Sequence, residues 1–171
     1  TQTCFIPELN LGYVIVSNSD QQSLFTALAY QIRDAYLGLP YRNYSDIFFP
    51  QFQAFEKQVA DTLAAKEKII AGKPKPALFL ENYTGKYVNR VYGSIDIKLE
   101  KNKLKIYFQH HPRTVGQLDA LGGNNFWCTY SDPEFGVKDI PFTVENGRVK
   151  SVTIRVNDFV DYMPYEFEKI Q

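Results

Sequence analysis

Residues 94–108 read SIDIKLEKNKLKIYF, and this stretch decides the fold. Ile95, Ile97 and Leu99 alternate with polar residues, and residues 103–108 alternate in the same way. Strict alternation puts one set of side chains on one face, as in a half-buried β-strand. Lys101-Asn102 between the two runs has the length of a two-residue hairpin turn. The stretch therefore predicts two antiparallel strands.

The same period of two continues through the rest of the C-terminal half. We expect further strands at residues 86–89, 117–121, 125–130, 140–144, 149–156 and 165–169, with Asn146-Gly147 as another hairpin turn. Eight short strands joined by tight turns, with no helix between them, predict an up-and-down barrel or a sandwich. An eight-stranded barrel has room for its own side chains or for one small ligand.

The N-terminal half has a different pattern, because up to Gly72 the apolar residues recur mainly at helical spacing. Residues 11–17 form an almost continuous apolar run, which predicts a strand covered on both faces. A helix follows over residues 22–37, with one apolar face made by Leu24, Leu28, Ile32 and Tyr36. A second helix is expected from about Pro50 to Ala71, and Lys73-Pro-Lys-Pro76 predicts a stiff linker after it.

Bulk composition excludes several classes of partner. Nineteen basic residues balance nineteen acidic ones, so no long-range field attracts nucleic acid or an anionic membrane. No apolar run approaches the roughly 20 residues needed to span a bilayer, and residues 1–10 lack the pattern of a signal peptide. We expect any export signal to lie outside this chain. Cys4 and Cys128 are read as buried small hydrophobic residues, with one bridge between them left open.

Two segments resemble one protein family. Residues 80–93 (LENYTGKYVNRVYG), with residues 104–106, 118–126, 140–144 and 147–152, resemble the lipocalin-like C-terminal domain of unknown function appended to many β-lactamase-related serine hydrolases. Residues 7–18 and 32–40 are similar to the last strand and terminal helix of the hydrolase domain itself. The resemblance implies an α+β chain: an antiparallel eight-stranded lipocalin-like barrel preceded by one strand and two helices.

The division that follows has three parts. Residues 1–45 are expected to be the remnant of the hydrolase domain, residues 46–79 a helix with its Pro-rich linker, and residues 80–171 the barrel. At the family's characteristic positions, Gly85 and Gly93 are expected to permit tight backbone turns, and Tyr83 and Tyr87 to close the base of the barrel.

The catalytic sequence elements of such hydrolases are absent or occur at positions where they could not form the catalytic site. No serine is followed three residues later by lysine, and no Lys-Thr-Gly or His-x-Gly strand precedes Pro7. Tyr41-Arg-Asn43 and Tyr87-Val-Asn89 match the Tyr-x-Asn element by letters only. We therefore expect an expressed fragment that is not an enzyme and that has no catalytic residues, no metal and no cofactor.

The resemblance implies an accessory domain that modulates substrate access or assembly of its own hydrolase domain. The alternative is a barrel that binds a small hydrophobic or cell-wall-derived ligand. A possible pocket lining is formed by Tyr107, Phe126, Trp127 and Phe142, although core packing explains such aromatic residues as well. The family further implies a bacterial, periplasmic or extracellular parent. The N-terminal strand and helix, lacking a sheet, are expected to fold back on the barrel or to form a homodimer.

The histidines and acidic residues that could bind a metal or act in catalysis are better explained by structural roles. His110 and His111 are expected at a strand end or in a loop, because adjacent strand residues point to opposite faces and Pro112 should break the strand. Asp132, Glu134 and Asp139 fit an acidic turn better than a calcium loop. The remaining acids near strand ends, Asp158, Asp161 and Glu166, are interpreted as solvated polar positions. A residual enzyme that uses some other site among these residues is the third hypothesis.

Overall fold

The computed structural model describes residues 1–18, 23–158 and 160–170. The chain forms two compact units, Thr1–Leu63 and Ala64–Gln171. The long helix α2 (Tyr44–Ala71) belongs to both, since the division falls inside it. The three-part division at residues 45 and 79 stays a prediction. In the described part of the chain, no helix combines the length and apolar character needed to cross a bilayer.

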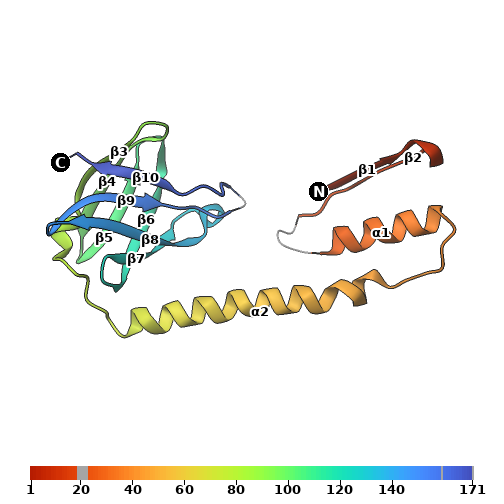
Figure 1. Cartoon of the computed structure of the whole chain (residues 1–171), viewed down its shortest axis with the longest axis horizontal. Helices are drawn as coiled ribbons and strands as arrows, with labels where there is room; N and C mark the ends of the chain where they lie inside the picture. The colour runs from red at the N-terminus through yellow and green to blue at the C-terminus, as the bar shows by residue number, and fades with distance from the viewer. Residues whose placement is uncertain (19–22, 159, 171) are drawn as a thin grey trace. The chain divides into compact units, whose positions relative to one another are not determined.

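The first unit opens with a hairpin. Strands β1 (Gln2–Ile6) and β2 (Leu11–Ile15) pair antiparallel, and the 3₁₀ turn η1 (Pro7–Leu9) joins them, with Asn10 in the left-handed conformation (Figure 1). Strand β1 is one strand more than the sequence predicts. The predicted capping residues Ser19 and Asp20 lie outside the described residues. Helix α1 (Leu24–Tyr36) confirms the predicted helix of this region.

One face of this hairpin is covered and the other is not. The covered face packs toward α1, where Ala27 and Ala29 are buried and the Tyr13 hydroxyl donates to the Ala29 carbonyl at 3.1 Å. The opposite face carries Phe5 and Val14, whose exposed fractions are 71% and 61%. The strand at residues 11–15 is therefore covered on one face only, although the sequence predicts cover on both, because α1 packs on one side of the hairpin and Phe5 and Val14 stay exposed on the other.

Helix α2 begins earlier than expected. Asn43 caps it, because its side-chain oxygen accepts the amide of Asp46 at 3.4 Å and its amide nitrogen donates to the Asp46 carboxylate at 2.8 Å. The helix therefore starts at Tyr44 and continues through Pro50, where the sequence predicts the helix to begin. Within the described chain no residue of α2 is buried, and its apolar positions Phe55, Val59 and Leu63 stay more than a third exposed.

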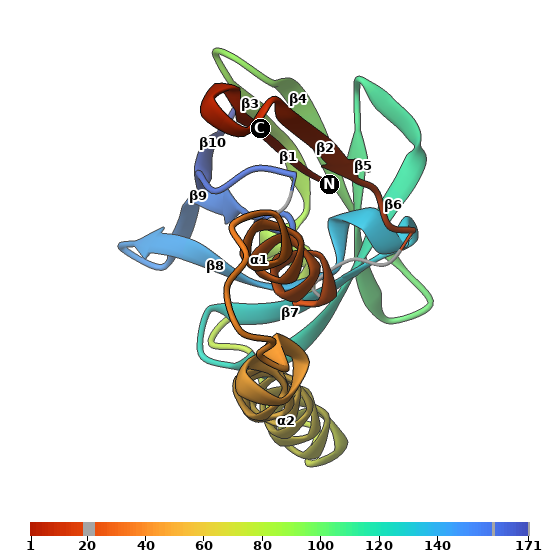
Figure 2. The ribbon, with the colours of Figure 1, turned by 90° about the vertical axis from the view of Figure 1, so that its right-hand side faces the viewer.

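The second unit is a closed antiparallel barrel. Its strands pair in chain order, and the last one pairs with the first, so that their labels follow one another around a ring in Figure 2. They are β3 (Gly85–Asn89), β4 (Gly93–Glu100), β5 (Lys103–Phe108), β6 (His111–Gly122), β7 (Asn125–Tyr130), β8 (Val137–Glu145), β9 (Arg148–Ile154) and β10 (Tyr165–Lys169). This confirms the predicted α+β class and the eight-stranded barrel.

The two predicted hairpin turns are present. Lys101 and Asn102 have φ of 49° and 62°, and Asn146 and Gly147 have φ of 51° and 73°. Positive φ at both central residues is the geometry of the tight turn that matches strand twist. The interpretation of Pro112 was wrong, because β6 begins at His111 and includes this proline. Proline is tolerated there because it lies at the start of the strand, beside an irregularity in the β5–β6 pairing.

The linker after α2 is fixed to the barrel. Pro76 bridges to Gly123, and the Ala77 amide donates to the Gly123 carbonyl at 2.7 Å. The last turns of α2 are held as well, since Lys66 Nζ lies 2.6 Å from an oxygen of the Asp139 carboxylate and 5.3 Å from the centroid of the Trp127 ring.

Candidate functional site

One end of the barrel is filled by its own side chains. The 3₁₀ helix η2 (Leu80–Tyr83) enters this end and places the fully buried Tyr83 ring 5.0 Å from the rings of Phe126 and Phe142. The Tyr83 hydroxyl donates to Asn124 Oδ1 at 2.7 Å and accepts the Leu78 amide at 3.3 Å. Two hydrogen bonds and two edge-on ring contacts hold the Tyr83 ring inside this end of the barrel. We call this end the plugged end.

Tyr87 completes the plugged end. It is fully buried, its hydroxyl donates to the Tyr83 carbonyl at 2.7 Å, and burial raises its pKa above the usual value. Lys169 lies beside it, with Nζ 2.7 Å from the Asn82 carbonyl, and burial lowers the pKa of its ammonium. The expectation that Tyr83 and Tyr87 close the base of the barrel is confirmed.

The opposite end, the open end, contains a cavity of about 400 Å³. Four connections of the up-and-down chain meet there: those between β3 and β4, β5 and β6, β7 and β8, and β9 and β10. Its floor is formed by Ile95, Thr114, Ile154 and Phe167, all buried and all on barrel strands. Ligand pockets span roughly 300–1,000 Å³, so this volume suits one small molecule.

An aromatic wall lines one side of the cavity. The ring centroids of Phe108 and Tyr130 lie 6.0 Å apart, those of Tyr130 and Phe135 6.0 Å, and those of Phe135 and His111 5.9 Å. Phe135 is placed by η3 (Pro133–Phe135), which begins where Asp132 accepts the Glu134 amide at 3.1 Å. Burial raises the pKa of Tyr130, so its hydroxyl stays protonated and donates to the Arg155 carbonyl at 2.5 Å.

A carboxylate lies on the other side of the mouth. Asp161 Oδ2 accepts the hydroxyls of Tyr92 at 3.1 Å and Tyr165 at 2.9 Å, and Oδ1 accepts the Met163 amide at 2.9 Å. These hydrogen bonds lower the pKa of Asp161, and the one from the Met163 amide contributes most. The carboxylate is therefore ionised at neutral pH. The two tyrosine rings pack together with centroids 4.3 Å apart.

The β5–β6 turn is fixed to the neighbouring start of β4. Gln109 Oε1 accepts both the amide and the hydroxyl of Ser94, at 3.0 and 2.9 Å. Gly93 has φ of 75°, a backbone conformation that favours glycine, and a Cβ there would lie 2.7 Å from His110 Nε2 and 2.9 Å from Gln109 Oε1. His110 and His111 both line the cavity, because His110 belongs to a turn where strand alternation does not apply.

The described lining of the cavity includes one serine, two histidines and one aspartate. Its serine hydroxyl, that of Ser94, is committed to Gln109 rather than to an imidazole. In the parts of the chain that the structure describes, no three His, Cys, Asp or Glu side chains cluster closely enough to hold a metal ion. A nucleophile with an adjacent general base would be needed for covalent catalysis.

One family model matches the chain over residues 71–169, and its description is "Domain of unknown function (DUF3471)". The match covers more than half of the sequence and contains the whole barrel. The chain belongs to the DUF3471 family. No curated protein and no solved structure matches it.

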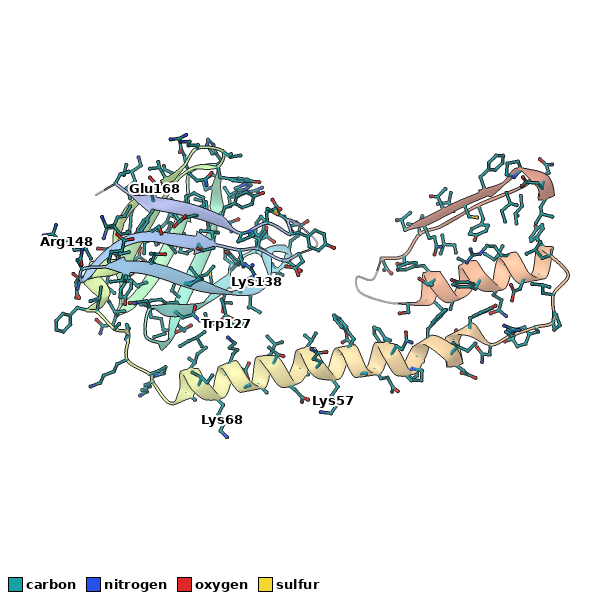
Figure 3. All side chains as sticks on the ribbon, in the orientation of Figure 1. Lys57, Lys68, Trp127, Lys138, Arg148 and Glu168 are labelled. Atoms are coloured by element: carbon teal, nitrogen blue, oxygen red, sulfur yellow. The ribbon has the colours of Figure 1, made fainter. Side chains whose placement is uncertain are left out.

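The four residues proposed from the sequence as a pocket lining are divided between two places in the DUF3471 barrel. Phe126 and Phe142 are buried at the plugged end, with ring centroids 5.3 Å apart. Tyr107 and Trp127 are half-exposed on the outer face: the Tyr107 hydroxyl donates to Glu100 at 2.6 Å, and Trp127, labelled in Figure 3, lies near Lys66. The described lining of the cavity contains none of the four.

The acidic residues of the DUF3471 barrel are also separated. Asp139 pairs with Lys66, Asp158 pairs with Lys138 at 3.0 Å, and Glu166 accepts the Ser151 hydroxyl. Of these residues, Figure 3 labels Lys138. Asp161 alone among the acids considered from the sequence lines the cavity. The useful signal was topological: in an up-and-down barrel every second connection lies at the same end, so Tyr92, His110, Phe135 and Asp161 meet there.

Proposed function

We propose that this DUF3471 barrel is a non-catalytic module that binds one small, mainly apolar molecule in its open end. The cavity of about 400 Å³ supports this most directly, because aromatic and aliphatic side chains make up most of its described lining and the other end of the barrel is plugged. A few polar groups at the mouth, among them Asp161 and Gln109, would orient the ligand. Hydrophobic and cell-wall-derived molecules are the first classes to consider.

A cavity-filling variant tests the proposal. Thr114 is buried on β6 and lines the floor, so Thr114→Phe places a ring in the cavity. Thr129→Phe on β7 is the matched control, because Thr129 is exposed on the outer face. The probe is N-phenyl-1-naphthylamine, a neutral dye whose emission rises in apolar sites. We expect saturable binding that Thr114→Phe abolishes and Thr129→Phe retains. Equal binding by both variants would place the dye elsewhere and overturn the proposal.

A second role is compatible with binding: accessory domain of a β-lactamase-related serine hydrolase. The sequence resemblance supports it, and so does the hairpin β1–β2. Its outer face exposes Phe5 and Val14 in this chain, although a strand that is apolar on both faces belongs inside a larger sheet structure. The body of an exported hydrolase, periplasmic or extracellular, would supply that cover. The barrel would then modulate substrate access or assembly.

Hydrolysis assays separate the accessory role from catalysis. Nitrocefin and p-nitrophenyl acetate are offered to this chain and, in parallel, to a full-length hydrolase that carries the domain. We expect turnover only by the full-length protein. Turnover by this chain would overturn the non-catalytic proposal and would direct attention to His110 and His111 at the cavity mouth.

A further inference from the structure

The charge of the open end is one-sided. Asp161 is the one carboxylate on the described lining, and no lysine or arginine accompanies it there. In the described part of the chain Asp161 also forms no ion pair with a basic side chain. Its three hydrogen bonds come from neutral donors, two tyrosine hydroxyls and a backbone amide. The carboxylate therefore carries a negative charge that no lysine or arginine of the described lining offsets.

This carboxylate still has capacity to accept. A carboxylate offers roughly four acceptor positions, and Oδ2 uses two of them while Oδ1 uses one. Oδ1 therefore retains an acceptor position. The neighbouring donors fix Asp161 in place, so that a ligand would not have to order it.

The remaining lining has the chemistry that attracts a cation. Six aromatic rings surround the space: Tyr92, Phe108, Tyr130, Phe135, Tyr165 and Phe167. The faces of such rings are electron-rich and attract ammonium groups within about 6 Å. A bound anion would be repelled by Asp161 and would find no lysine or arginine on the described lining. A neutral molecule would offer no positive group to pair with the carboxylate of Asp161.

We propose that the open end of the barrel binds a small organic cation. Its ammonium group would lie against Asp161 and the aromatic rings of the lining, and its apolar body would lie over the floor residues Ile95, Ile154 and Phe167. The inference rests on the proposed ligand-binding function and adds the class of ligand.

Three probes of nearly the same shape test the class: 2-phenylethylammonium, 2-phenylethanol and 3-phenylpropionate. They differ in charge, and each is titrated into the complete ¹⁵N-labelled chain at pH 7, with affinity taken from amide chemical-shift changes. We expect the ammonium to bind about tenfold more tightly than the alcohol, since a partly exposed charge pair with cation–π contacts is worth about that factor. The carboxylate probe should bind most weakly.

Asp161→Asn removes the charge and keeps an acceptor for the two tyrosine hydroxyls. It should lower the affinity for the ammonium about tenfold and change that for 2-phenylethanol by less than about twofold. Asp158→Asn is the matched control, because Asp158 belongs to the same connection but pairs with Lys138. This control should bind all three probes as the unaltered chain does.

The outcomes distinguish the two proposals. Binding of the ammonium and the alcohol with equal affinity, or an Asp161→Asn variant with unchanged preference, would overturn the ligand class and leave the binding function standing. Absence of shifts at the open end with every probe and with N-phenyl-1-naphthylamine would overturn both.

Discussion

The plugged end predicts a large effect from the loss of a single oxygen atom. In Tyr83→Phe the ring keeps its contacts with Phe126 and Phe142, but the hydroxyl is removed. Asn124 Oδ1 then loses a donor at 2.7 Å and the Leu78 amide loses an acceptor at 3.3 Å. A hydrogen bond contributes about 1 kcal/mol, and a buried group left without a partner costs about 1–3 kcal/mol. We expect the free energy of unfolding to fall by about 2 kcal/mol.

The assay uses the fluorescence of Trp127, the only tryptophan in the chain, which lies on β7 of the barrel. Urea unfolding curves are compared for the unaltered chain, Tyr83→Phe and Tyr162→Phe. Tyr162 is 82% exposed, so the same chemical change there should alter the free energy of unfolding by less than about 0.5 kcal/mol. Equal stability of the two variants would refute the inference that these hydrogen bonds hold the plug.

Three more predictions concern the barrel and the thiols. Burial raises the pKa of Cys128 to about 12. At pH 8 Ellman's reagent should therefore modify Cys4 in the folded chain and reach Cys128 only after unfolding. Equal rates of modification of the two thiols in the folded chain would contradict this. The pKa of Glu100 is lowered by hydrogen bonds, chiefly the one from the Tyr107 hydroxyl. The ionised carboxylate therefore stabilises the folded state above its unfolded pKa of about 4.3. This contribution is lost as the pH falls through the pKa that Glu100 has in the folded chain. Glu100→Gln should therefore lose less stability than the unaltered chain between pH 6 and pH 3 in urea unfolding, whereas parallel losses would exclude this role. A Cβ at Gly116 would lie 2.7 Å from Cys128 Sγ, so Gly116→Ala should cost about 1–3 kcal/mol, and Cys128→Ala should restore part of that loss; strict additivity in the double variant would argue against the contact.

The barrel is predictable from the sequence because its signals are local. Alternation places Ile95, Ile97, Leu104 and Ile106 inside, and all four are fully or almost fully buried. The turn residues at 101–102 and 146–147 fix the register of their hairpins, because few backbone conformations close a two-residue turn.

The errors have physical causes as well. The spacing of apolar residues predicts the start of the second helix at about Pro50, yet the Asn43 cap starts α2 at Tyr44, six residues earlier. Strand β1 does not stand out in the sequence, because its residues QTCFI do not alternate strictly between polar and apolar. The cavity could not be predicted from periodicity, since its mouth consists of connections that are far apart in the sequence. Asp161 looked like a solvated residue until the fold brought Tyr92 and Tyr165 to it.

The two ends of the barrel carry different constraints on sequence change. The plugged end holds the interlocking rings of Tyr83, Tyr87, Phe126 and Phe142, where most substitutions disturb several neighbours at once. The connections at the open end are tied mainly to one another and to strand ends. New specificities can therefore arise by drift or by directed evolution in residues 90–92, 109–110 and 155–164 while the scaffold persists. A library of variants confined to those positions would change which ligands bind while the barrel still folds.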